Sequence, residues 1–148
     1  MTSIKIKSDE EFTSSIEKLK WVMACLRDPE NGCPWDKEQD FKSIMPYTIE
    51  EAYEVADAIE NGSMDHLEEE LGDLLLQVIY HAQMASEENI FSFDSVAQKV
   101  ADKMISRHPH VFGDVDAQNS ADVTEIWEQQ KSKETQSKGV LDNVTLGL

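Results

Sequence analysis

The sequence predicts an all-α protein, and three observations support that prediction. Apolar residues recur at the three- and four-residue intervals of amphipathic helices along most of the 148 residues. No segment shows the strict alternation of a half-buried strand, and no internal repeat is found. The four prolines and six glycines fall mostly outside the periodic segments. We expect a four-helix-type bundle forming one domain over residues 1–135, followed by a loose tail over 136–148.

The first predicted helix is followed by a long loop. Ser8-Asp9-Glu10-Glu11 matches a capping box, which predicts a helix from there to about Leu26. The stretch 27–46 holds three prolines and a glycine, so it is expected to be a loop with a short helical turn at 36–39. Loops of that length in compact domains tend to carry function.

Four more helices are predicted after this loop. They cover about 47–60, 64–88, 92–106 and 120–135, with Asn61-Gly62 ending the first of them and Pro109 following the third. Helical spacing places one apolar face on the 47–60 helix, made by Ile49, Ala52, Tyr53, Ala56 and Ile59.

The helix predicted over 64–88 carries two apolar stripes with a polar line between them. The larger stripe consists of Leu67, Leu71, Leu74, Leu75, Val78 and Ala82, and the smaller of Leu76, Tyr80 and Met84. The polar line consists of Glu70, Asp73, Gln77 and His81. A helix that is apolar on two sides needs two partners, so we expect a homodimer or a higher homo-oligomer.

The composition excludes several classes of protein. Thirty acidic residues against 13 basic ones give a net charge of −17, which disfavours binding to a nucleic acid polymer. No apolar run reaches the ~20 residues that span a bilayer, and the first residues lack the apolar core of a secretion signal. We therefore expect a cytoplasmic protein without a membrane partner, whose two cysteines need no pairing.

Two carboxylate pairs are the chemically informative feature. Glu51 and Glu54 share one face of the helix predicted over 47–60, and Glu70 and Asp73 share one face of the next. The intervening turn makes these helices antiparallel neighbours, so the pairs face each other and repel unless a cation lies between them. Oxygen ligands favour Mg²⁺, with Mn²⁺ as a substitute.

Other interpretations of these acids stay open. Each pair alone is common on solvated helix faces, and Thr48 with Glu51 also fits a capping box. A di-iron site would require Glu-x-x-His pairs, which neither motif contains. Gly72, inside a strong helix, costs about 1 kcal/mol relative to alanine, which indicates close approach of a neighbouring helix or a ligand.

Several motifs together resemble the MazG-type nucleotide pyrophosphohydrolases of the all-α NTP pyrophosphatase superfamily. Glu51-x-x-Glu54 is followed by Glu70-x-x-Asp73 in the order of that family's metal motif. The flanking text is also similar, at residues 26–29 (LRDP), 32–36 (GCPWD), 47–55 (YTIEEAYEV), 70–75 (ELGDLL) and 107–112 (RHPHVF). The resemblance covers about residues 19–131.

The resemblance implies hydrolysis of nucleoside triphosphates to monophosphate and pyrophosphate, with Mg²⁺, in an oligomer of helical bundles. It places the metal on Glu51, Glu54, Glu70 and Asp73, with Glu50 as an outer or additional ligand. Glu51 or Glu54 is the candidate for orienting or deprotonating the attacking water. Which nucleotide is preferred does not follow from the resemblance.

Nucleotide contacts are expected from four further residues. The resemblance assigns phosphate contacts to Lys103 and Arg107 and a nucleotide contact to Trp127, while Trp35, a loop aromatic, is a candidate lid or base contact. The alternatives are a solvated helix face for the two cations and core packing for the two tryptophans. His108 and His110 are interpreted as part of a helix-ending turn rather than a zinc pair.

The residues that follow the predicted domain suggest an alternative function. Residues 139–144 (GVLDNV) resemble the start of the connector in two-domain members of this family, so the chain is a candidate N-terminal half. The alternative to an enzyme is therefore a non-catalytic dimerisation or nucleotide-binding module of a larger two-domain protein.

Overall fold

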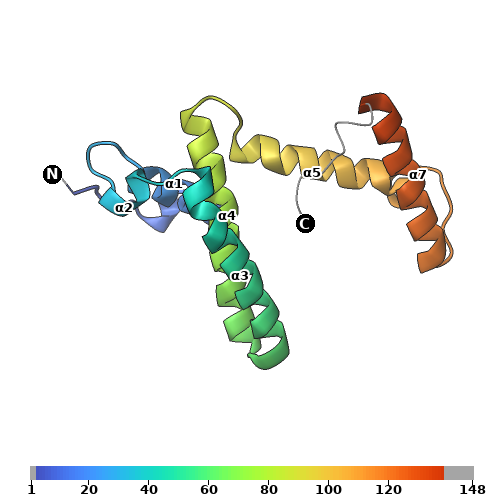
Figure 1. Ribbon diagram of the computed structural model, residues 1–148, viewed down its shortest axis with the longest axis horizontal. Coiled ribbons are helices and arrows are strands. Elements are labelled where there is room, and N and C mark those ends of the chain that lie inside the picture. Colours follow the sequence, from blue (N-terminus) through green and yellow to red (C-terminus); the bar gives the residue numbers. More distant parts are fainter. Residues whose placement is uncertain (1–2, 139–148) are drawn as a thin grey trace. The chain divides into compact units, whose positions relative to one another are not determined.

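The computed structural model describes residues 3–138, and every regular element within that range is helical (Figure 1). The all-α prediction is therefore confirmed. The chain divides into two compact units, residues 1–95 and 96–148, which are described separately below. Most of the predicted tail, including the 139–144 segment, lies outside the described residues.

The first unit begins with a capping box that closes only one turn. The Ser8 backbone N–H donates to Glu11 Oε2 at 2.7 Å, and the turn it closes is the 3-10 helix η1 (Asp9–Glu11). Phe12 is then extended, and Ser14 caps α1 (Ser15–Leu26) by accepting from the Glu17 N–H at 3.2 Å. The predicted continuous helix is wrong in its first turn, because a second capping serine follows the first.

The second long helix of this unit begins earlier than predicted. α3 (Phe41–Asn61) starts with a reciprocal cap, in which Asp40 and Ser43 exchange side chain to backbone bonds of 2.8 Å. Pro46, which was expected to lie in the loop, is an exposed residue inside this helix. Proline has no N–H, so one carbonyl of the helix loses its hydrogen-bond partner, but on an exposed face that carbonyl can bond water. The cap formed by Asp40 and Ser43 therefore starts the helix before Pro46. The short turn predicted at 36–39 is α2 (Pro34–Lys37).

α3 packs against α4 (Met64–Glu87) as an antiparallel pair joined at Gly62 and Ser63 (Figure 1). Ser63 caps α4 by accepting from the His66 N–H at 3.2 Å. α1 packs against α4 as well, and the core of the unit is formed by Met23, Ile44, Ile79, Tyr80 and Met84. This core fixes α3 relative to α4, and the carboxylate motifs lie on these two helices.

The apolar face predicted on α3 does not contact α4. The least exposed residues of α3 are instead Ile44, Thr48, Glu51, Val55 and Ala58, a different face at the same helical spacing. Ile49, Tyr53 and Ile59 are 53%, 73% and 62% exposed. On α4, Leu71 and Val78 of the larger predicted stripe are 48% and 40% exposed. Within this unit the two helices therefore keep an uncovered apolar face.

The second unit contains most of α5 (Phe93–Arg107), the short α6 (Pro109–Phe112) and α7 (Ser120–Lys138). Among the described residues of the second unit, Ile126 of α7 is the buried hydrophobic residue. Arg107 Nη2 bonds Glu134 Oε2 at 2.8 Å, which ties the end of α5 to α7. α7 runs beyond the predicted end at residue 135.

None of the helices formed by residues 3–138 is long and apolar enough to cross a membrane. The cytoplasmic location stays a prediction.

Candidate functional site

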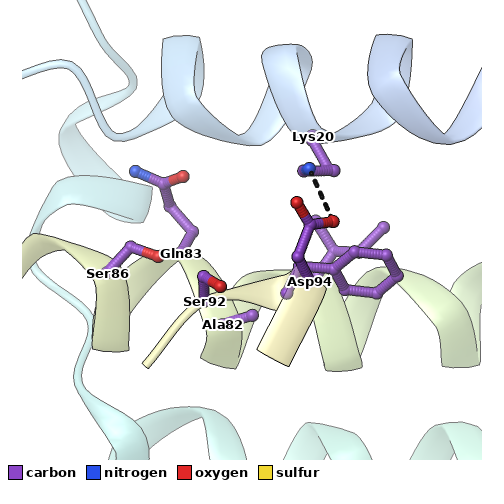
Figure 2. Close-up of a pocket in the computed structure, with 8 residues that line it drawn as sticks. Lys20, Ala82, Gln83, Ser86, Ser92 and Asp94 are labelled. Carbon is purple, nitrogen blue, oxygen red and sulfur yellow. Dashed lines mark ion pairs between the residues drawn. The ribbon is translucent and has the colours of Figure 1, made fainter. Parts of the chain in front are cut away.

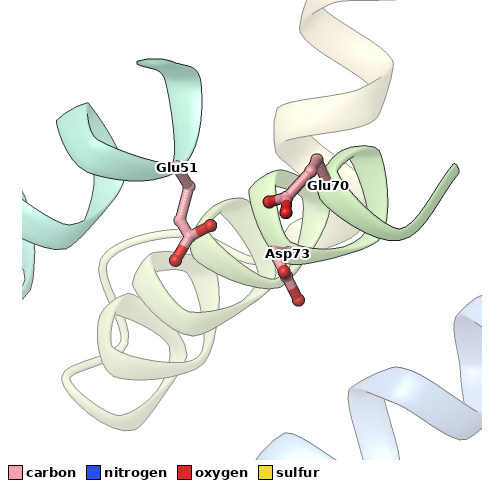
Figure 3. Close-up of side chains that lie close together, drawn as sticks. All are labelled: Glu51, Glu70 and Asp73. Atoms are coloured by element: carbon pink, nitrogen blue, oxygen red, sulfur yellow. The ribbon is translucent and has the colours of Figure 1, made fainter. Parts of the chain in front are cut away.

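Three of the predicted metal ligands meet between α3 and α4. Glu51 on α3 and Glu70 and Asp73 on α4 each offer one carboxylate oxygen, and these oxygens all lie within 4.8 Å of one another (Figure 3). Glu51 and Glu70 are half-buried and Asp73 is exposed. The antiparallel pairing that sequence spacing predicted is what brings them together, since each motif presents its acids on the facing side of its helix.

Glu54 and Glu50 do not join this group. Both are exposed on α3, Glu54 one turn beyond Glu51 and Glu50 directly before it. The charges of both nevertheless raise the pKa of Glu51. The structure thus places the four predicted metal ligands as a close group of three with one outlying acid.

The electrostatics of the group favour a cation. Partial burial raises the pKa of Glu51 above its ordinary value, and the charges of Asp73 and Glu70, then Glu50 and Glu54, raise it further. Burial and each of these neighbouring charges disfavour the charged form of Glu51. A bound cation would remove the repulsion, and an all-oxygen ligand set is the kind that hard divalent cations prefer. The residues present therefore fit a divalent metal.

His66 is a neighbour of the group that sequence reasoning missed. Its Nε2 lies 3.2 Å from Glu70 Oε1, one turn earlier on α4. The i,i+4 spacing of His66 and Glu70 is the signal that would have identified the contact. A carboxylate held by a second side chain is better oriented toward a ligand than a free one.

The predicted polar line of α4 continues beyond the acids as a hydrogen-bonded seam. Thr48 Oγ1 on α3 donates to Gln77 Oε1 at 3.0 Å and lies 3.1 Å from His81 Nε2. Gln77 is 8% exposed, and the His81 ring stacks on Phe41 at 5.9 Å between centroids. Burial lowers the pKa of His81, so its ring is held neutral. This seam fixes the register of the two helices beside the acids.

Gly72 lies between Glu70 and Asp73 on α4. A Cβ built at Gly72 would meet no atom of residues 3–138 within 4 Å. The predicted close approach of a neighbouring helix is therefore wrong for the described part of the chain, and approach of a ligand stays a prediction. The space at Gly72 is open to solvent.

Trp35 and the α3 aromatic Tyr47 lie in the same unit as the acids. The two rings meet edge to face, with centroids 5.7 Å apart. Trp35 is 47% exposed and Tyr47 43%. Trp35 is therefore not a core residue, which removes one of its two predicted roles.

The remaining predicted nucleotide contacts lie in the second unit. The Arg107 guanidinium stands 4.9 Å from the centroid of the Trp127 ring and forms the ion pair with Glu134. Lys103 is exposed and lines a hollow with Glu134. The structure thus gathers Lys103, Arg107 and Trp127 around one end of α5.

The predicted turn at the end of α5 is present. His108 lies 2.6 Å from the Met104 carbonyl through Nδ1, and its ring packs edge-on against Trp127. Pro109 then opens α6. These contacts agree with a structural turn at His108 and Pro109.

A separate cavity of about 220 Å³ lies between α1, α4 and the start of α5 (Figure 2). Lys20 is the cation among its lining residues, and it is paired with Asp94 at 3.6 Å and Glu17 at 3.1 Å. Its Nζ also lies 5.6 Å from the Phe93 ring centroid. Because these acids neutralise Lys20, the cavity does not resemble a phosphate site.

The fold and the acidic group together define a helical protein with a carboxylate site between two antiparallel helices. Residues 39–112 match the model of the MazG nucleotide pyrophosphohydrolase domain. The chain belongs to this family, which confirms the resemblance noted from its motifs.

Relatives from bacteria are named for the same activity. The chain is 51% identical over 138 residues to the nucleoside triphosphate pyrophosphohydrolase of Escherichia coli K12, covering 91% of this chain and 52% of that protein. It is 44% identical to the nucleoside triphosphate pyrophosphohydrolase/pyrophosphatase MazG of Thermotoga maritima, covering 82% and 48%. The chain therefore spans about half the length of the curated relatives it matches.

A solved structure supports the fold. The crystal structure of a mazG-related protein from Thermotoga maritima superposes with a TM-score of 0.64 at 27% identity, covering 78% of this chain and 98% of that one.

Proposed function

We propose that this chain hydrolyses nucleoside triphosphates to a nucleoside monophosphate and pyrophosphate at a divalent cation held by Glu51, Glu70 and Asp73. The observation that carries the proposal is the meeting of these three carboxylates between α3 and α4. Membership of the MazG family and the names of the relatives support the reaction. No observation favours the non-catalytic alternative.

The proposed metal is Mg²⁺, with Mn²⁺ as a substitute. The three ligands are oxygen donors, and the group contains no cysteine or histidine. When bound, such an ion would neutralise charge on the phosphates and acidify a bound water. Glu51, Glu70 and Asp73 would hold it, and His66 would orient Glu70.

The proposed base is Glu54 rather than Glu51. Glu51 belongs to the group of three, whereas Glu54 lies one turn further along α3 with an exposed carboxylate. A carboxylate that does not coordinate the metal is available to take a proton from water. Glu54→Gln should lower kcat while Mg²⁺ binding is retained, and Glu51→Gln should weaken Mg²⁺ binding. Equal loss of Mg²⁺ binding in both variants would show that Glu54 is also a metal ligand.

The remaining site residues are proposed as nucleotide contacts. Lys103 and Arg107 are the phosphate contacts, and Arg107 would exchange its bond to Glu134 for one to a phosphate oxygen. Trp127, already packed on the Arg107 guanidinium, would contact the nucleotide beside it. Glu50 would support Glu51 from outside the group.

A homodimer is the proposed assembly. Ile49, Tyr53 and Ile59 of α3 are all more than half exposed and share a helix face with Ala52 and Ala56. Leu71 and Val78 extend the apolar surface onto α4. A contiguous apolar surface of this kind marks a protein interface, and a second copy of the same surface is its simplest complement.

Pyrophosphate release tests the proposed reaction directly. The purified chain is incubated with each of the common ribo- and deoxyribonucleoside triphosphates and Mg²⁺, and pyrophosphate and monophosphate are quantified. We expect stoichiometric release of both products, abolished by chelation and by Asp73→Asn. If no triphosphate yields pyrophosphate at high enzyme concentration, the proposed activity is wrong for this chain.

A further inference from the structure

The loop between α1 and α3 is held in one conformation by Arg27. The Arg27 side chain is 10% exposed, and its Nη1 donates to the Asp36 carbonyl at 2.6 Å and to the Gln39 carbonyl at 3.1 Å. Nε and Nη2 both bond the Glu87 carboxylate at 2.8 Å. These bonds hold the pKa of Glu87 below its ordinary value. One largely buried guanidinium therefore ties the C-terminal end of α2 and the residue Gln39 beyond it to Glu87 of α4.

Two further contacts fix the same backbone. The Tyr80 hydroxyl, on a residue that is 4% exposed, lies 3.0 Å from the carbonyl and from the Oδ1 of Asp36. Gln39 Nε2 donates to the carbonyl of Trp35 at 2.8 Å. At the start of the loop, a Cβ on Gly32 would lie 2.4 Å from the Leu26 carbonyl oxygen, so only glycine fits that turn.

The residue at the centre of this rigid loop is nevertheless exposed. Trp35 shows 47% of its surface, and its ring is in edge-to-face contact with Tyr47. Tryptophan is usually buried in a well-ordered framework, because its ring removes a large apolar area from water. The backbone on both sides of Trp35 is fixed, and its ring faces solvent. A side chain held in this way is already positioned to contact a ligand.

The aromatic pair lies beside the acidic group on α3. Tyr47 and Glu51 are separated by one turn, so their side chains share a face of the helix and stand about 6 Å apart along its axis. Trp35 meets the Tyr47 ring edge to face. The side of α3 that carries Glu51 therefore runs from carboxylates to exposed aromatic rings.

We propose that Trp35, braced by Tyr47, is the base-binding half of the nucleotide site, and that the free face of its ring stacks on the nucleobase. The inference rests on the proposed function, because it takes the triphosphate to lie at Glu51, Glu70 and Asp73. Stacking uses the π-face that every nucleobase has, so this contact raises affinity for all bases and discriminates weakly among them.

Binding of two polyphosphates separates this role from a structural one. Calorimetry with Mg²⁺ compares a nucleoside triphosphate with a non-hydrolysable α,β-methylene bridge and inorganic tripolyphosphate, which has no base. Trp35→Ala should weaken the nucleotide analogue roughly 10-fold and leave tripolyphosphate unchanged. Trp35→Phe, which keeps a π-face, should recover part of the loss. Phe112→Ala, which removes another exposed aromatic ring, should change neither affinity.

Two results would overturn the proposal. Equal affinity of Trp35→Ala and the unaltered chain for the nucleotide analogue would show that the ring does not contact the base. Equal weakening of both ligands would show that Trp35 supports the fold of the site instead. Circular dichroism and thermal unfolding of each variant identify a loss of folding.

Fluorescence supplies a second measurement. Saturating nucleotide analogue should quench the tryptophan emission of a Trp127→Phe variant, and adding Trp35→Phe to that variant should remove most of the remaining quench. A quench of the same size in both proteins would contradict stacking at Trp35.

The outcomes also distinguish this proposal from the proposed activity. If the chain releases pyrophosphate and Trp35→Ala binds the nucleotide analogue as tightly as the unaltered chain, the proposed reaction is supported and the proposed base contact is wrong. If Trp35→Ala weakens binding of the nucleotide analogue but the unaltered chain releases no pyrophosphate, the proposed base contact is supported and the proposed reaction is wrong.

Discussion

Thr48 on α3 is joined to Gln77 on α4 by a 3.0 Å hydrogen bond, one helical turn from the acidic group. Gln77 is 8% exposed, so its amide has little access to water. The bond therefore fixes how far α3 is shifted along α4, and with it the distance between Glu51 and the two acids of α4. This hydrogen-bonded pair of partly buried polar side chains therefore sets the register of the two helices.

Thr48→Val tests this register. The substitution keeps the shape of the side chain but leaves Gln77 Oε1 without its donor, which should destabilise the fold by about 1–2 kcal/mol. Mg²⁺ affinity should fall as well, because the helices are freer to shift. Urea unfolding and calorimetric Mg²⁺ titration measure the two effects. Loss of stability with unchanged Mg²⁺ affinity would show that the bond does not position the acids.

Asp73→Asn tests the proposed metal site in the folded protein. Mg²⁺ at a hundredfold excess over its Kd should stabilise the unaltered chain by about 2.7 kcal/mol, and the variant should lose most of this gain. Glu68→Gln is the matched control, since Glu68 is an exposed acid on the same helix and lies outside the group. Thermal unfolding with and without Mg²⁺ gives the readout. A full Mg²⁺ response in Asp73→Asn would move the site elsewhere.

His81 should contribute a pH dependence to stability. Burial lowers its pKa in the folded chain, so below about pH 6.5 the unfolded chain takes up a proton that the folded chain does not. The contribution of neutral His81 is therefore present above that pH and is lost as the pH falls. The stability advantage of the unaltered chain over His81→Gln should shrink between pH 7.5 and 5.5. A constant difference in unfolding free energy would contradict this.

Arg27→Lys tests the rigidity of the loop that presents Trp35. Lysine keeps the charge but cannot reproduce the guanidinium fork that bonds Glu87 and two carbonyls together. We expect a loss of about 1.5 kcal/mol in unfolding free energy and faster proteolysis within residues 28–40. Unchanged cleavage there would show that Tyr80 and Gln39 suffice to hold the loop.

Ile49→Asp tests the proposed dimer. A charge placed in the apolar face of α3 should be tolerated by the monomer, because Ile49 is 53% exposed, but should prevent burial of that face against a second copy. Ile6→Asp is the control at an 83% exposed isoleucine outside the face. Sedimentation should show a dimer for the unaltered chain and the control, and a monomer for Ile49→Asp. A dimeric Ile49→Asp variant would place the interface elsewhere.

The helices that the sequence predicted well are those with strong local signals. α4 begins after Ser63 and ends within one residue of the predicted boundary, because a serine cap and long periodicity agree. Capping contacts explain the two misplaced starts. The Ser8 box closes only a single turn, and the reciprocal cap of Asp40 and Ser43 carries α3 through Pro46.

Helical periodicity identified an apolar face on α3 but not its partner. Ile49 and Tyr53 lie on that face and are exposed, while the face with Ile44 and Ala58 packs within the chain. Periodicity reports which residues share a side of a helix, and it contains no information on which element covers that side.

The sequence by itself determined that Glu51 and Glu54, like Glu70 and Asp73, share helix faces, because helical spacing is local. Only the tertiary structure decided that three of these acids meet while Glu54 stays outside, since that depends on the rotation and register of α3 against α4. The same holds for Trp35, whose exposure beside Tyr47 follows from contacts of Arg27 and Tyr80 with residues distant in the chain. Such contacts arise when helices pack, and no local pattern specifies them.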